Sequence, residues 1–153
     1  RKSEAVLQNE PGKTGPEPFE GISPGLDPLS RAARVQERMA AFGFDWENVE
    51  GALAKVREEI VELEQVADTN SAFRIGDASA AVEEEAGDLL FAAANTARLA
   101  GVHPTNALLA SISKFEDRCR RMIELAEIRD IDWETVGIET LDFLWDEVKQ
   151  EES

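Results

Sequence analysis

The stretch VEEEAGDLLFAAANTARL, residues 82–99, begins with acidic residues and continues as an almost uninterrupted apolar run. Asp88 lies where the apolar part has already begun, between Gly87 and Leu89. Apolar residues fall on nearly every side of a helix built from this stretch, which predicts a helix at the centre of a bundle or in a subunit interface. We therefore expect Asp88 to be buried, where a carboxylate needs protonation, a basic partner or a metal ion.

The rest of the chain also has helical periodicity and no strand-like alternation of useful length. Asp27-Pro28 is an N-cap followed by proline at the first helical position, and Gly43 ends that helix near residue 42. Asp45 is the expected cap of the second helix. Further helices are predicted over 79–100, from Pro104 to about 128, and after a break at 130–137. The sequence therefore predicts an all-α helical bundle of four to five main helices.

The first 27 residues differ in composition from the remainder. Five of the six prolines and four of the ten glycines lie within the first 28 residues, where no periodicity is sustained. We expect a linker or extended tail over 1–27 and one domain over 28–150.

The chain carries 32 acidic and 16 basic residues, a formal charge of −16. Such a balance argues against nucleic-acid or anionic-membrane partners, which need a positive surface. No apolar run reaches the ~18–20 residues that span a bilayer. Cys119 is the single cysteine, which fits a reducing cytoplasm.

Two pairs of carboxylates have the same helical spacing. Glu59 and Glu62 are three residues apart, as are Glu85 and Asp88, and Asn95 shares the face of Asp88 seven residues later. Two antiparallel helices joined by a short loop would bring the pairs together. Clustered carboxylates suit Mg²⁺ or Mn²⁺, whereas most acidic helix faces are simply solvated, and both readings stay open at this point.

The single histidine counts against several alternative kinds of active site. His103 stands at a helix start with Ala100 three residues before it, so the Glu-x-x-His repeats of a di-iron bundle are absent. A zinc hydrolase and a histidine-based triad are disfavoured for the same reason. His103 is expected to be a cap or loop residue.

Basic residues concentrate in KFEDRCRR, residues 114–121. Lys114 and Arg118 are four residues apart on one helical face and could bind a phosphate-bearing ligand. The alternative is pairing within the helix to Glu116 and Asp117. Trp145 has apolar neighbours at helical spacing, so core packing is its first interpretation and stacking on a nucleobase its second.

These motifs together resemble a known family. EEIVE at 58–62 and EAGD at 85–88 are similar to the E-E-x-x-E…E-x-x-D signature of the MazG family of all-α nucleoside triphosphate pyrophosphohydrolases. The segments 29–46, 82–101 and 107–118 are similar to MazG segments in the same order, so the resemblance covers about residues 28–150. Cys119 departs from the aromatic that many members have there, and residues 1–27 resemble the linker before the C-terminal domain of two-domain members.

The resemblance implies Mg²⁺-dependent hydrolysis of an NTP or dNTP, canonical or not, to the monophosphate and pyrophosphate, in the cytoplasm, as a house-cleaning or pool-regulating activity. The resemblance also implies that Mn²⁺ can replace Mg²⁺ and that the protein forms a homodimer. The implied metal ligands and catalytic residues are Glu59, Glu62, Glu85 and Asp88, with Glu59 as the expected proton acceptor. The implied substrate contacts are Lys114, Arg118, Asn95 and Trp145.

A different class of function stays open beside this one. A non-catalytic helical dimer could keep the same fold and bind a nucleotide or a protein partner. Such a protein would be expected to lack part of the carboxylate quartet, and all four residues are present here.

Overall fold

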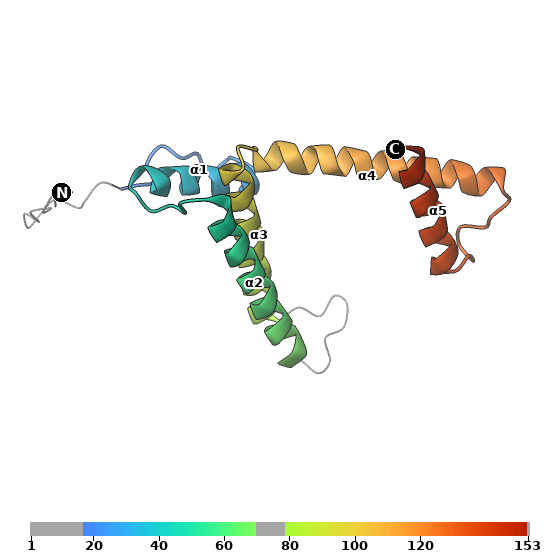
Figure 1. The fold of residues 1–153 in the computed structure, drawn as a ribbon, viewed down its shortest axis with the longest axis horizontal. Coiled ribbons are helices and arrows are strands. Elements are labelled where there is room, and N and C mark those ends of the chain that lie inside the picture. The colour runs from blue at the N-terminus through green and yellow to red at the C-terminus, as the bar shows by residue number, and fades with distance from the viewer. Residues whose placement is uncertain (1–16, 70–78, 153) are drawn as a thin grey trace, which may run out of the picture. The chain divides into compact units, whose positions relative to one another are not determined.

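The computed structural model describes residues 17–69 and 79–152 (Figure 1). It contains the helices α1 Pro28–Ala41, α2 Val49–Thr69, α3 Ala80–Leu99, α4 Pro104–Ile128 and α5 Ile138–Glu151. Neither range contains a strand, so the predicted all-α class is confirmed. The first 16 residues of the expected tail lie outside the described residues, as do residues 70–78 between the two carboxylate-bearing helices.

The predicted helix boundaries follow from local hydrogen bonds. Asp27 accepts a hydrogen bond from the Ser30 N–H at 3.1 Å and so caps α1. Gly43 adopts a φ of +88°, a left-handed conformation that glycine reaches without strain, directly after α1. The expected cap of the second helix is wrong, because Asn48, not Asp45, accepts the Gly51 N–H at 3.0 Å.

Contacts along the chain form two compact units, 1–101 and 102–153, which are described separately. In the first unit, α2 and α3 lie side by side and α1 packs on α3 (Figure 1). Gln36 of α1 donates a hydrogen bond to the Phe91 carbonyl of α3 at 2.9 Å. The buried apolar residues of this unit are mostly small: Ala33, Ala52, Val82, Ala92 and Ala94. Small residues let helix backbones approach closely, which holds the facing carboxylates of α2 and α3 at short range.

The expectation that α3 lies at the centre of the bundle is wrong for this unit. Leu90 and Phe91 are 64% and 47% exposed, since α1 and α2 cover only part of the helix. The alternative reading, a subunit interface, stays a prediction. None of the described helices is both long and apolar enough to cross a membrane.

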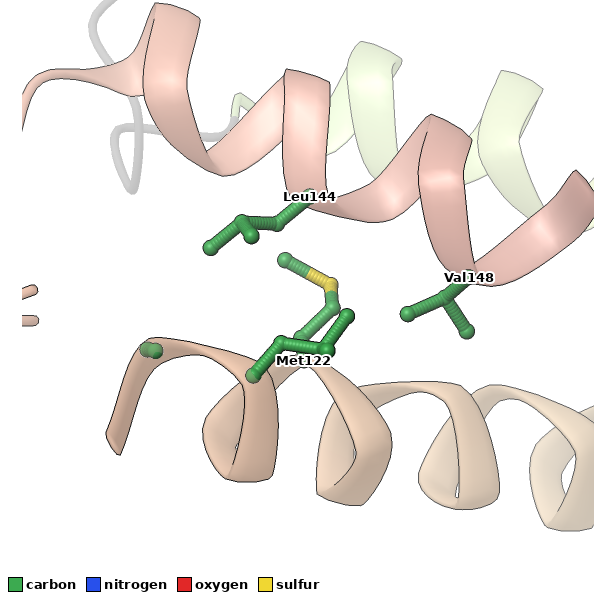
Figure 2. Close-up of a cluster of buried hydrophobic side chains, with 5 residues drawn as sticks. Met122, Leu144 and Val148 are labelled. Atoms are coloured by element: carbon green, nitrogen blue, oxygen red, sulfur yellow. The ribbon is translucent and has the colours of Figure 1, made fainter. Parts of the chain in front are cut away.

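In the second unit, α4 packs against α5. Figure 2 shows Leu144 and Val148 pointing from α5 toward Met122 on α4. Leu125 and Ala126 complete the buried cluster, and Trp145 packs against it as partly buried apolar surface. His103 occupies the N-cap of α4 without a side-chain hydrogen bond, as expected of a cap or loop residue.

Candidate active site

Three of the four predicted carboxylates meet where α2 packs on α3. One carboxylate oxygen each from Glu59, Glu85 and Asp88 lies within 4.8 Å of the others. Glu85 and Asp88 come from consecutive turns of α3, and Glu59 faces them from α2. The predicted convergence is therefore present for Glu59, Glu85 and Asp88, whereas Glu62 is not one of the three that meet.

The burial within this cluster differs from the expectation for Asp88. Glu59 is the buried member at 3% exposure, Glu85 is intermediate and Asp88 is exposed. Asp88 lies on a part of α3 that α1 and α2 leave uncovered within the described residues. By contrast, Glu58, next to Glu59 on α2, is exposed and pairs with Lys55 at 3.0 Å.

Lys55 supplies the basic partner of the buried carboxylate. Its Nζ lies 2.6 Å from Glu59 Oε1, one helical turn away. This hydrogen bond holds the pKa of Glu59 below its ordinary value, while the pKa of Lys55 is raised. The nearby Glu59 carboxylate raises the pKa of Glu62, with burial and the charge of Glu85 adding to the effect. Glu62 thus belongs electrostatically to the same cluster.

The cluster has the chemistry of a divalent-cation site. Glu59 Oε2 is buried and has no hydrogen-bond partner within the described ranges. A buried unpaired carboxylate oxygen is costly, and one lysine cannot neutralise four carboxylates. Hard oxygen donors are what Mg²⁺ and Mn²⁺ prefer, so the residues fit such an ion.

A cavity of about 500 Å³ adjoins the carboxylates. Glu59, Asp88 and Lys55 line it, and Asn95 and Arg98 contribute further polar groups. Its apolar lining comes from α1, the segment before α2, and α3, and consists of Val35, Met39, Phe44, Trp46, Phe91 and Ala92. With a divalent cation on the carboxylates, this arrangement would suit a ligand with an aromatic part for the apolar pocket and a phosphorylated part for the cation.

Asn95 is held at the cavity by a network that the sequence did not indicate. Arg98 donates from Nε to Asn95 Oδ1 at 2.9 Å and from an NH2 group to Asp45 Oδ1. The Arg98 guanidinium holds the pKa of Asp45 below its ordinary value. Asp45 and Arg98 are 53 residues apart, and only the packing of α3 near the segment before α2 reveals that they meet.

The remaining predicted substrate contacts lie in the second unit. Arg118 donates from Nε and NH2 to the Glu152 carboxylate, the shortest of these bonds being 2.7 Å. Its guanidinium carbon lies 5.5 Å from the centre of the Trp145 ring, which also contacts Phe115 at 5.4 Å. Lys114 is exposed. Arg118 is thus joined to α5, and its expected proximity to the carboxylates stays a prediction.

The alternative interpretation was that Lys114 and Arg118 pair within α4 with Glu116 and Asp117. These two carboxylates instead pair with Arg120, at 3.2 Å and 2.7 Å. Glu152 was missed from the sequence because nothing in its spacing distinguishes it from the other acidic residues near the end of the chain.

Comparison with known proteins points to one family. No family model matches the chain. It is 36% identical over 146 residues to the nucleoside triphosphate pyrophosphohydrolase/pyrophosphatase MazG of Thermotoga maritima, covering 95% of this chain and 53% of that protein. It is also 36% identical over 134 residues to the nucleoside triphosphate pyrophosphohydrolase of Escherichia coli strain K12, covering 88% of this chain and 49% of that protein. The chain thus spans about half the length of these curated relatives, and the matches, which extend over most of the chain, support its assignment to the MazG family.

Proposed function

We propose that this chain hydrolyses nucleoside triphosphates, NTPs or dNTPs, to the monophosphate and pyrophosphate with Mg²⁺. The observation that carries the proposal is the meeting of Glu59, Glu85 and Asp88 beside the 500 Å³ cavity. The two relatives are named for this activity, and their alignments cover 88–95% of this chain. A role in removing or regulating nucleotides, in the cytoplasm, follows as part of the same proposal.

Glu59, Glu62, Glu85 and Asp88 would hold the Mg²⁺, and Mn²⁺ could take its place. A bound divalent cation neutralises phosphate charge and lowers the pKa of water. Glu59 is the proposed proton acceptor, because Lys55 holds Oε1 and Oε2 has no partner within the described residues. Because Lys55 lowers the pKa of Glu59, this carboxylate would be ionised at neutral pH, as a proton acceptor must be.

The proposed substrate contacts are Asn95, Lys114, Arg118 and Trp145. The cavity in the first unit would take the nucleoside, with Asn95 as a contact. Lys114 and Arg118 of the second unit would bind the phosphates, and Trp145 would support Arg118 through its ring. Arg118 already holds a carboxylate in a two-pronged contact, which is the geometry that arginine uses for phosphate oxygens. Phosphate binding would then replace Glu152.

A homodimer is proposed from apolar residues that the single chain leaves exposed. On α4, Leu108, Leu109 and Phe115 are 49–58% exposed, and on α3 Leu90 is 64% exposed. Water-exposed apolar patches of this kind mark protein interfaces. The −16 charge supports the further expectation that neither nucleic acid nor a membrane is a partner.

The experiment is a pyrophosphate-release screen over canonical and modified NTPs and dNTPs with Mg²⁺. Asp88→Ala should abolish release while keeping the helical content seen by circular dichroism. Glu84→Ala is the matched control, since Glu84 is an exposed carboxylate on the same helix and lies outside the cluster. Full activity in Asp88→Ala would refute the metal-ligand assignment. Silence of the wild-type protein over the whole panel would favour the non-catalytic binding function.

A further inference from the structure

A hydrogen-bond network in the lining of the cavity joins Asp45, Arg98 and Asn95. Asp45 accepts from an NH2 group of Arg98, and Arg98 Nε donates to Asn95 Oδ1. Asp45 belongs to the segment before α2, whereas Arg98 and Asn95 lie one turn apart on α3. All three residues line the cavity.

This network determines the orientation of the Asn95 amide. An arginine has only hydrogen-bond donors, so the atom facing Arg98 Nε must be the amide oxygen. The NH2 group of Asn95 then remains as the donor end, and it has no hydrogen-bond partner within residues 17–69 and 79–152. The cavity therefore receives a donor from Asn95.

Arg98 itself is committed to its two protein partners. Its side chain is 14% exposed, and that of Asp45 is 26% exposed. A guanidinium that is already paired with a carboxylate and an amide oxygen is a poor receptor for a further phosphate. Its effect on a ligand therefore passes through Asn95.

The position of Asn95 separates it from the carboxylates. Seven residues from Asp88 to Asn95 correspond to two turns, about 10 Å along α3. The lining of the same cavity also includes the aromatic side chains Phe44, Trp46 and Phe91. Phosphates held at the carboxylate end would place the other end of a nucleotide among these aromatic side chains and near Asn95.

We propose that Asp45 and Arg98 are positioning residues that fix the Asn95 amide so that its NH2 group donates to an acceptor atom on the nucleobase. The proposal rests on the proposed function, because it takes the ligand to be a nucleoside triphosphate. It adds the polarity of the recognised group, a carbonyl oxygen or ring nitrogen, and two residues that act through the Asn95 amide.

Asn95→Asp is the direct test, since it keeps an oxygen for Arg98 and removes the donor. Steady-state kinetics of pyrophosphate release should show KM rising about tenfold, the loss expected for one hydrogen bond to a buried group, with a smaller change in kcat. Arg98→Lys should also raise KM, because one ammonium cannot reproduce the planar fork of a guanidinium. Asp45→Ala should raise KM as well, and Asp45→Glu should restore it in part.

A double variant distinguishes a positioning role of Arg98 from general damage to the fold. In the Asn95→Asp background, Arg98→Lys should raise KM no further, since both changes remove the same donor. Additive effects in the double variant, or an unchanged KM in Asn95→Asp, would overturn the proposal. Circular dichroism of each variant checks that the helices are retained.

A binding measurement makes the proposal independent of turnover. The probes are the four α,β-methylene deoxynucleoside triphosphates, which cannot release pyrophosphate, measured by calorimetry with Mg²⁺. Wild type should bind them about tenfold tighter than Asn95→Asp, whereas a matching analogue with indole in place of the base, which offers no acceptor, should bind both equally. If the wild type binds the nucleotide analogues more tightly than Asn95→Asp does but hydrolyses no triphosphate, the proposed function is refuted and this inference stands. If the wild type hydrolyses triphosphates but binds the analogues no more tightly than Asn95→Asp does, the inference is overturned. Failure of the wild type to bind any analogue would overturn it as well.

Discussion

Gly51→Ala tests whether Trp46 is seated on α2 as a wall of the cavity. Gly51 lies in the first turn of α2, where a Cβ would stand 2.7 Å from Trp46 Cε3 and 3.2 Å from Cδ2. Carbon atoms that are not bonded to each other do not come this close unless one of them is displaced. Adding a methyl group at this position must therefore move the indole or the helix.

The size of the effect comes from a comparison with Gly87, a helical glycine of α3 with open space around it. A Cβ at Gly87 would meet no heavy atom within 4 Å. Gly87→Ala should stabilise the fold by up to about 1 kcal/mol, the difference in helix propensity between the two residues. Gly51→Ala gains less than this and incurs an overpacking cost of about 1–3 kcal/mol. The two variants should thus differ by about 1–3 kcal/mol.

Thermal unfolding followed by circular dichroism measures this difference. At this chain length, 1 kcal/mol corresponds to a shift of about 2–4 °C in Tm, so Gly51→Ala should melt several degrees below Gly87→Ala. The displaced indole should also weaken nucleotide binding in the cavity. Equal or higher stability of Gly51→Ala would refute the seating of Trp46 on Gly51.

Three further outcomes follow from other parts of the molecule. Leu144 is 1% exposed and packs on Met122, so Leu144→Ala should lower the free energy of unfolding by about 2–5 kcal/mol in urea titrations, and a loss below about 1 kcal/mol would mean that this core is not packed as described. The Arg98 contact lowers the pKa of Asp45 below 3.8, so its stabilisation is fully present above the unfolded value and is lost as pH falls through the folded pKa. Asp45→Asn should therefore lose less stability than wild type between about pH 5 and pH 2, and parallel pH profiles would contradict the pairing. Mg²⁺ should raise the Tm of wild type, by the equivalent of about 2.7 kcal/mol at a hundred times its Kd, and should raise that of Glu59→Gln much less, whereas an equal rise in both proteins would place the ion elsewhere.

Much of the helical framework could be predicted from local signals. Asp27-Pro28, Gly43, Gly101 and Pro104 mark chain positions where backbone hydrogen bonding must stop or start, and the helices begin and end within a few residues of them. These signals work because a cap or a left-handed glycine acts within its own turn. The pairing of Glu59 with Glu85 and Asp88 could also be predicted, since helical spacing and a short connection were enough.

The remainder depends on tertiary contacts that no local pattern encodes. Asp45 has the residue type and position of a helix cap, yet it pairs with Arg98, 53 residues away. Lys55 was overlooked because a lysine one turn before a glutamate is ordinary on a solvated helix, and only the burial of Glu59 gives the pair a role. Asp88 was expected to be buried because its sequence neighbours are apolar. Its actual exposure depends on which side of α3 the other helices cover.

The central proposal is that the carboxylates of α2 and α3 support Mg²⁺-dependent hydrolysis of nucleoside triphosphates to the monophosphate and pyrophosphate. Phosphorus NMR of a reaction with Mg²⁺ and the best triphosphate of the screen tests it most directly, because it distinguishes the bond that breaks. The predicted result is that the wild type and Glu84→Ala both form monophosphate and pyrophosphate in equal amounts. Asp88→Ala should form neither product. Formation of diphosphate and inorganic phosphate, or equal turnover by Asp88→Ala, would contradict the claim.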